Sequence, residues 1–399
     1  MGGGRRAVAG FAPLTVSAPI ILDVNRLIWR RWRGSLPTGV DRVCLAYVEH
    51  FGARARAVVR FKGRHLALSP CRSRALFALL LEGGPDFRKH FVTFVARAIL
   101  PGSWGRVPAG AFYLNVGHTG LEDPDLATWV ERHRLRAIYL VHDLIPLTHP
   151  QYCRPDEDEK HGRRMRTILA SAAGVIGNSQ ATLDDLAAFA AGEGMAMPPT
   201  VVAWLSGQAI ARPSSSAVAG RPYFLVLGTI EGRKNHRLLL EVWRGLHASL
   251  GDKIPRLVIV GARGWEADDV FAQLDDLGPL APFIDEKRHC SDAELAELMA
   301  GARALLMPSF AEGYGMPVFE ALEFGTPVIA ADLPVYHEVA GDIPTYLDPD
   351  DADAWARVVI RYCEDDPERA RQIGAMRSFQ VPDWAAHFAV VDRWMATLD

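Results

Sequence analysis

At 399 residues the chain is longer than a single hydrophobic core usually supports, so we expect two domains. Its apolar share of 49% is ordinary for a soluble globular protein, and its longest uncharged run, residues 7–22, is too short to cross a membrane. Five scattered cysteines without a C-x-x-C pair favour a reducing compartment and argue against a zinc site.

The net charge of −3 hides a strong asymmetry along the chain. Residues 1–100 contain 17 Lys and Arg against 5 Asp and Glu, a net charge of +12, whereas residues 201–399 contain 18 against 30, a net charge of −12. We therefore expect an anionic partner on the N-terminal side: a lipid headgroup, a phosphorylated lipid or a nucleic acid. A solvated arginine-rich surface is the alternative.

The N-terminal half begins like a Rossmann-like domain. Residues 20–24 predict a first strand, and residues 36–42 (LPTGVDR) open an amphipathic helix. A glycine loop after a first strand admits phosphate in such domains, which makes Gly39 a candidate ligand contact, with a plain turn as the alternative. The intervening residues 26–33 hold two tryptophans and four arginines, typical of a headgroup boundary or of a mobile basic loop.

A histidine follows a predicted central strand of this domain. Residues 137–141 form a short apolar run that ends directly at His142. Ligands bind at the carboxyl edge of an open α/β sheet, so this imidazole is a candidate site residue, although a lone histidine is more often structural. Further strands are predicted at residues 57–61, 112–116 and 174–177, and helices at residues 76–81, 91–99 and 156–172.

A Gly-, Ser- and Pro-rich segment, residues 206–222, predicts an interdomain linker. We place the boundary near residue 213. This gives an N-terminal domain of residues 1–212, a C-terminal domain of residues 213–382 and a last helix at residues 383–399.

The second domain restarts the pattern with a strand at residues 223–227 and the loop GTIEGRKN at residues 228–235. In that loop Arg233 offers a planar fork of donors and Lys234 a compact charge. Together they match a diphosphate without requiring a metal ion, and surface charge is the alternative. The later GARG at residues 261–264 lacks the full dinucleotide-binding fingerprint.

The most informative stretch is residues 303–338. Residues 304–307 predict a buried strand, and a glycine-containing loop leads to a helix whose first turn holds Pro317. Glu312 lies in the loop and Glu320 on the first turn of the helix, so both carboxylates can point into one cleft and bind vicinal hydroxyls. Solvated charges at a helix start are the alternative.

Residues 310–329 read F-x-E-G-Y-G-M-P-x-x-E-A-x-x-x-G-T-P-V-I. This string resembles the E-x7-E signature of family 4 glycosyltransferases, retaining enzymes of the GT-B fold. The segment G-T-x-x-x-R-K-N at residues 228–235 resembles their donor-phosphate loop, and H-D-x-x-P at residues 142–146 and T-G-hydrophobic-x-R at residues 38–42 resemble two further motifs. The resemblance implies an α/β protein of two Rossmann-like domains whose parallel sheets face a central cleft, with a C-terminal helix that crosses back to the first domain.

The resemblance also implies residue roles. Glu320 binds ribose hydroxyls of a nucleotide-sugar, Glu312 holds a hydroxyl of the transferred sugar, and His142 contacts the donor sugar or faces the acceptor. The nucleobase slot falls near His289 and Cys290. The implied catalytic residues are Glu312, His142, Arg233 and Lys234, and the implied donor-binding residues are Gly39, Gly228, Thr229, Arg233, Lys234, Glu312, Gly313, Tyr314, Gly315 and Glu320.

No carboxylate is a clear nucleophile, so the family's front-face attack, with the leaving phosphate helping to deprotonate the acceptor, is expected. No cofactor and no metal are implied. The Asp-x-Asp triplets at Asp123, Asp156 and Asp348 lie in polar turns or helix starts and are interpreted as surface or capping residues.

We therefore expect a retaining, metal-independent glycosyltransferase that acts on a lipid-linked saccharide in bacterial surface polysaccharide synthesis. It would be cytoplasmic and peripheral on the inner face of the cell membrane, bound through its basic domain. Relatives with the T-G-hydrophobic-x-R pattern often use mannose donors, which favours GDP-mannose. The alternatives are a transferase with a soluble acceptor and a catalytically silent nucleotide-sugar-binding scaffold. Nucleic-acid binding is not expected, because no recognised motif supports it.

Overall fold

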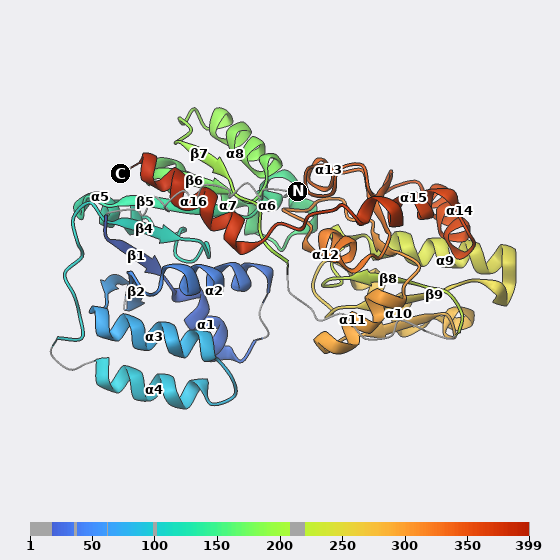
Figure 1. Ribbon diagram of the computed structural model, residues 1–399, viewed down its shortest axis with the longest axis horizontal. Helices are drawn as coiled ribbons and strands as arrows, with labels where there is room; N and C mark the ends of the chain where they lie inside the picture. The colour runs from blue at the N-terminus through green and yellow to red at the C-terminus, as the bar shows by residue number, and fades with distance from the viewer. Residues whose placement is uncertain (1–17, 36–37, 62, 99–101, 208–219, 399) are drawn as a thin grey trace, which may run out of the picture.

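The computed structural model describes residues 18–35, 38–61, 63–98, 102–207 and 220–398. These residues form two lobes, each built around one sheet and flanked by helices (Figure 1). The predicted boundary at residue 213 and most of the predicted linker lie outside the described residues.

The sheet of the N-terminal domain has the strand order β3-β2-β1-β4-β5-β6-β7. Neighbouring strands are parallel except in the β2–β3 hairpin. β1 is buried along its whole length between β2 and β4, as expected for an apolar run in a parallel sheet. The strands are β1 (Ile20–Asp23), β2 (Ala55–Phe61), β3 (Arg64–Ala67), β4 (Phe112–Asn115), β5 (Arg136–Val141), β6 (Ala172–Gly177) and β7 (Thr200–Val202).

Helices connect these strands and cover the sheet. Ser179 caps α8 by accepting a hydrogen bond from the Thr182 amide. The helices of this domain are α1 (Asn25–Arg33), α2 (Gly39–Phe51), α3 (Pro70–Glu82), α4 (Phe87–Ala98), α5 (Asp125–Arg132), α6 (Ile145–Thr148), α7 (Glu157–Ser171) and α8 (Gln180–Gly192), with a 3-10 turn η1 (Pro150–Tyr152).

The sheet of the C-terminal domain has the order β10-β9-β8-β11-β12-β13, and its pairs are parallel. Its strands are β8 (Tyr223–Leu227), β9 (Arg256–Val260), β10 (Ile284–Lys287), β11 (Leu305–Met307), β12 (Val328–Ala331) and β13 (Thr345–Leu347). Its helical elements are η2 (Gly232–Lys234), α9 (His236–Leu250), η3 (Gly251–Lys253), α10 (Asp268–Asp275), η4 (Gly278–Leu280), α11 (Asp292–Gly301), α12 (Met316–Phe324), α13 (Pro334–Ala340), α14 (Ala352–Cys363) and α15 (Pro367–Met376).

The strand order reverses direction at one place in each sheet, between β1 and β4 and between β8 and β11. Ligands of open parallel sheets bind at such switch points, outside the carboxyl ends of the strands. The loop at residues 228–235 follows β8, and the loop at residues 308–315 follows β11. The topology therefore brings both predicted donor loops to one edge of the sheet.

The last helix, α16 (Trp384–Thr397), leaves the C-terminal domain and packs on the N-terminal domain (Figure 1). The His387 ring pairs with the Tyr47 hydroxyl at 3.0 Å, and Asp392 accepts a hydrogen bond from His50 at 2.8 Å. The Phe388 ring stacks on the His50 ring with 3.9 Å between ring centroids. The predicted crossing of the C-terminal helix is confirmed.

The structure corrects one interpretation of the N-terminal segment. Residues 26–33 lie within helix α1, so the mobile-loop alternative is wrong. Two of its arginines, Arg26 and Arg30, pair with the buried carboxylate of Asp41 on α2, which ties the helix to the domain. Among the described residues, no helix is long and apolar enough to cross a membrane.

Candidate active site

The centre of the candidate site is one carboxylate held by two cations. Glu312 accepts hydrogen bonds from Arg233 Nη1 at 3.0 Å and from Ser309 Oγ at 2.8 Å, and it pairs directly with Lys234 Nζ. Arg233 also pairs through Nε with the buried Glu231 at 2.7 Å. The two predicted phosphate-binding cations and the predicted sugar-binding acid therefore form one network.

Electrostatics keep this carboxylate ionised. Burial raises the pKa of Glu312, but the nearby charges of Lys234 and Arg233 lower it more strongly, to about 2. The Glu312 side chain is only 7% exposed, so solvent screens the pair weakly. The Glu312 carboxylate is thus the shared anionic partner of both cations.

Backbone geometry explains how the sequence builds the loop after β8. Gly228 has φ +132°, a conformation that other residues rarely adopt, and it packs against the Lys234 stem. Residues Gly232–Lys234 form a 3-10 turn, and Asn235 in the left-handed region (φ 53°) starts α9. The turn aims both cations at the loop that follows β11. Thr229 follows Gly228 and lines a hollow of about 430 Å³ together with Arg233.

The second predicted glutamate lies on α12 and faces the N-terminal domain. The Glu320 carboxylate is 3.7 Å from Arg42 Nη1 on α2. The Gly39 backbone lies against the side chain of Met316, where a Cβ atom would overlap its methyl group. The N-terminal end of α2 therefore lies directly against the N-terminal end of α12.

His142 lies at the carboxyl end of β5, as the sequence predicts. Its Nε2 donates a hydrogen bond to the Val116 carbonyl at 2.8 Å, and burial lowers its pKa to about 4. The ring is therefore neutral at neutral pH, with Nδ1 left as an acceptor. A Cβ atom at Gly313 would lie 2.5 Å from the His142 carbonyl oxygen, so the loop of Glu312 touches this strand end.

Tyr314 and Gly315 contribute to packing around the loop. The Tyr314 side chain is buried and donates a hydrogen bond to the Leu205 carbonyl at 2.9 Å, so it joins the two domains. Gly315 has φ +80° and lies against the Tyr336 ring, which leaves no room for a side chain. At these two positions the side chain takes part in packing or is absent, so only the backbone could contact a bound nucleotide-sugar.

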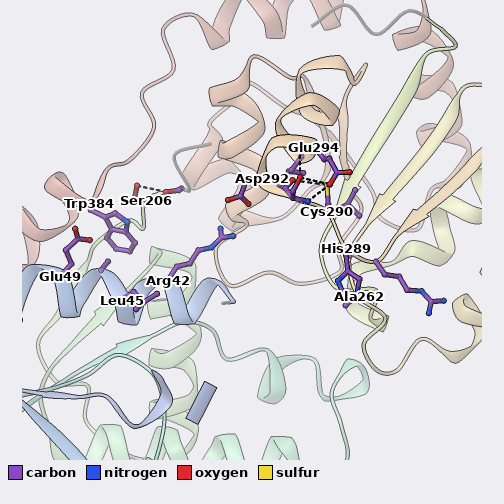
Figure 2. A pocket seen from close by; sticks show the side chains of 17 residues that line it. Arg42, Leu45, Glu49, Ser206, Ala262, His289, Cys290, Asp292, Glu294 and Trp384 are labelled. Carbon is purple, nitrogen blue, oxygen red and sulfur yellow. Dashed lines mark hydrogen bonds between the residues drawn. The ribbon is translucent and has the colours of Figure 1, made fainter. Parts of the chain in front are cut away.

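A cavity of about 940 Å³ lies between the two domains. Arg42, the neighbour of Glu320, lines it, whereas Glu312, Arg233 and Lys234 are not among its lining residues. Figure 2 shows Arg42, Leu45 and Glu49 of α2 on one wall and His289 and Cys290 on the other. The residues that the sequence assigns to a nucleobase slot therefore line an interdomain cavity of the size of a small-molecule site.

Several contributors were missed from the sequence. Ser309 and Glu231 hold the cation–carboxylate network, but only their contacts distinguish them from ordinary polar loop residues. Glu338 on α13 accepts hydrogen bonds from the Gln180 amide at 2.8 Å and from Trp204 Nε1 at 2.9 Å. It thus binds the N-terminal end of α8 in the other domain, which no local pattern could indicate.

The three Asp-x-Asp triplets lie where the sequence suggests. Asp123 pairs with Arg60, Asp156 precedes α7, and Asp348 accepts a hydrogen bond from the Asp350 amide. Within the described ranges, no group of three or more His, Cys, Asp or Glu side chains is arranged to hold a metal ion.

Comparison with known proteins identifies the second domain. Residues 208–379 match the family "Glycosyl transferases group 1". In sequence the chain is 31% identical over 245 residues to the O-antigen chain mannosyltransferase B of Escherichia coli. This alignment covers 59% of this chain and 64% of that protein. It is 29% identical over 247 residues to the serotype-specific mannosyltransferase WbdA of the same species, covering 56% of this chain and 30% of that protein. The chain thus spans less than two thirds of these relatives.

Solved structures show the same fold. HepE of Anabaena, in complex with UDP and glucose, aligns with a TM-score of 0.67 at 16% identity, over 95% of this chain and 100% of that one. The sucrose-phosphate synthase of Thermosynechococcus elongatus aligns with a TM-score of 0.62 at 16% identity, over 96% of this chain and 99% of that chain. The fold is GT-B, as predicted.

Fold and family therefore agree. Residues 208–379 match the group 1 glycosyl transferase family, and the described part of this segment forms the second lobe of a GT-B fold. The resemblance found in the sequence is confirmed at this level.

The pKa of Glu312 predicts a pH dependence of stability. Its pKa lies below the ordinary value of 4.5, so the ion pairs stabilise the fold fully above about pH 4.5 and are lost as the pH falls towards about 2. Urea unfolding of wild type across this range should show a fall in unfolding free energy of about 2 kcal/mol that Glu312→Gln lacks. The exposed Glu297→Gln should behave like wild type. Identical pH profiles for wild type and Glu312→Gln would contradict the ion-pair assignment.

Proposed function

We propose that the protein is a retaining glycosyltransferase that transfers a sugar from a nucleotide-sugar to a saccharide hydroxyl in bacterial surface polysaccharide synthesis. The observation that carries the proposal is the network of Glu312 with Arg233 and Lys234 at the switch point of the second sheet. The family match of residues 208–379 and the relatives named for O-antigen mannosyl transfer support it.

The two cations suit the charge that develops during transfer. When the bond between the anomeric carbon and the phosphate oxygen breaks, its electron pair stays on the diphosphate. Arg233 and Lys234, released from Glu312, stabilise that negative charge in a site shielded from water. Because the network already holds both cations in place, little reorganisation is needed. Glu312 is then free to accept a hydrogen bond from a hydroxyl of the transferred sugar.

The acceptor side completes the reaction. The acceptor oxygen attacks the anomeric carbon from the face that the diphosphate leaves, and its proton passes to the leaving phosphate. Neutral His142, through Nδ1, accepts a hydrogen bond from a sugar hydroxyl beside Gly313. Glu320 holds the ribose, with Arg42 beside it. No metal ion is required in this scheme, because the two cations supply the positive charge.

We further propose mannose as the sugar and GDP-mannose as the donor, because the curated relatives cited above are named as mannosyltransferases. The acceptor in this proposal is a lipid-linked saccharide, and the protein acts on the cytoplasmic face of the cell membrane. On α1 and α4 the side chains of Trp32, Val92 and Val95 are between 41% and 56% exposed. Arg33 and Arg88 lie among them, a combination that suits an anionic lipid surface.

Transfer activity tests the proposal directly. Purified protein with GDP-mannose and a mannose-terminated saccharide on a lipid or alkyl carrier should release GDP and lengthen the saccharide, with or without EDTA. Lys234→Ala should lower kcat by about two to three orders of magnitude, because one charge that stabilises the leaving group is lost.

The exposed Lys253→Ala is the matched control and should keep wild-type activity. Equal transfer rates to an alkyl-linked saccharide and to the free saccharide would favour the soluble-acceptor alternative. Donor binding without hydrolysis or transfer would support the silent scaffold and overturn the proposal.

Flotation with vesicles tests the membrane part. With vesicles rich in phosphatidylglycerol, the protein should float at low salt and be released at about 0.5 M salt, since screening weakens the attraction of the basic domain. Val92→Ser should weaken flotation several-fold, whereas Val390→Ser, an exposed valine on α16, should not. Flotation that is absent at low salt would remove the membrane association from the proposal.

A further inference from the structure

A second cavity, of about 810 Å³, lies in the N-terminal domain beside the candidate site. Its walls come from α1, from the loops after β4 and β5, and from α7, and one residue, Trp265, comes from the C-terminal domain. No sequence motif marked this cavity as a whole. Its volume is that of a small-molecule site.

The inner end of the cavity touches the donor loop. His142 and Asp143 line it, and a Cβ atom at Gly313 would lie 2.5 Å from the His142 carbonyl and 2.8 Å from Asp143 Cβ. Asp143 and Trp265 also line the hollow that contains Arg233. A molecule in this cavity would therefore present its inner end to the sugar held near Glu312.

The charges of the cavity are balanced. Three arginines and three carboxylates line it, and each of these arginines is paired within the described part of the chain. Arg26 donates to Asp41 at 2.7 Å, Arg60 pairs with Asp123, and Arg164 donates to Glu157 at 3.0 Å and to Glu122 at 3.3 Å.

The histidines of the cavity add no charge. His118, His142 and His161 each donate from Nε2 to a backbone carbonyl, at 2.8, 2.8 and 3.1 Å. Burial lowers the pKa of all three, so the rings are neutral at neutral pH. Each neutral ring then offers Nδ1 as an acceptor, which suits hydroxyl groups.

Aromatic faces complete the lining. Trp29 is 50% exposed and Trp265 37% exposed, and both line the cavity. Flat apolar faces beside a few placed polar groups are typical of small-molecule sites, and they suit the C–H faces of sugar rings. Trp29 and Trp32 lie on α1, so the outer end of the cavity opens at the helix that we propose to face the membrane.

We propose that this cavity binds the uncharged saccharide end of the acceptor and rejects an end that carries a phosphate or a carboxylate. The inference rests on the proposed function for its biological meaning. Because each lining arginine already has a carboxylate partner, an anionic sugar would have to compete for those arginines, and it would lie close to the carboxylate of Asp143. The phosphate groups of a lipid carrier would then stay outside, towards α1.

Direct binding tests this inference without requiring turnover. We would titrate the protein with a mannose disaccharide and with the same disaccharide bearing a uronic acid at its non-reducing end, and follow tryptophan fluorescence and calorimetric heat. The neutral sugar should bind at least about tenfold more tightly. Trp265→Ala should weaken its binding by about tenfold, whereas Trp104→Ala, which removes an exposed tryptophan outside the cavity, should not.

A charge variant provides a second and independent test. Asp123→Asn removes the partner charge of Arg60 but keeps an oxygen for the Asp125 amide. It should therefore improve binding of the uronic acid sugar relative to the neutral one, whereas the exposed Asp269→Asn should leave the ratio unchanged. Equal binding of both sugars, or a ratio that Asp123→Asn does not move, would overturn the inference. Preserved GDP release from GDP-mannose would show that the proposed function stands even then.

Discussion

The site depends on an anionic side chain buried between two cations. Glu312 is nearly inaccessible to solvent, and its charge is tolerable there only because Lys234 and Arg233 lie against it. The same pairing constrains both loops, since one cation-bearing turn follows β8 and the carboxylate follows β11. The chain thus uses an internal ion-pair network to hold the loops after β8 and β11 together.

Contacts between the domains fix the remaining geometry. Gly39 lies on Met316, Gly313 on the strand end at His142, and Glu338 holds the N-terminal end of α8. The helix α16 adds a separate connection, since it starts near the other domain and runs across the first domain against α2 (Figure 1). The cleft walls are therefore held by small residues whose backbones approach closely and by two acids, Glu320 and Glu338, that contact the other domain.

Much of this could be predicted from the sequence, because the strongest signals are local. Apolar runs predicted the central strands, and the residues around Glu312 predicted a loop between β11 and α12. Contacts between distant segments could not be predicted. The hydrogen bond from the Gln180 amide to Glu338 joins residues 158 positions apart along the chain, and only the fold brings them together.

The most direct test of the central claim, that the donor binds on the Glu312 network in the interdomain cleft, is backbone hydrogen exchange with and without saturating GDP-mannose. Exchange should slow at residues 228–236 and 309–320, and at residues 142–146 across the cleft, because these three segments enclose the donor. Protection confined to other segments, with these three unchanged while the nucleotide-sugar is bound, would contradict the account.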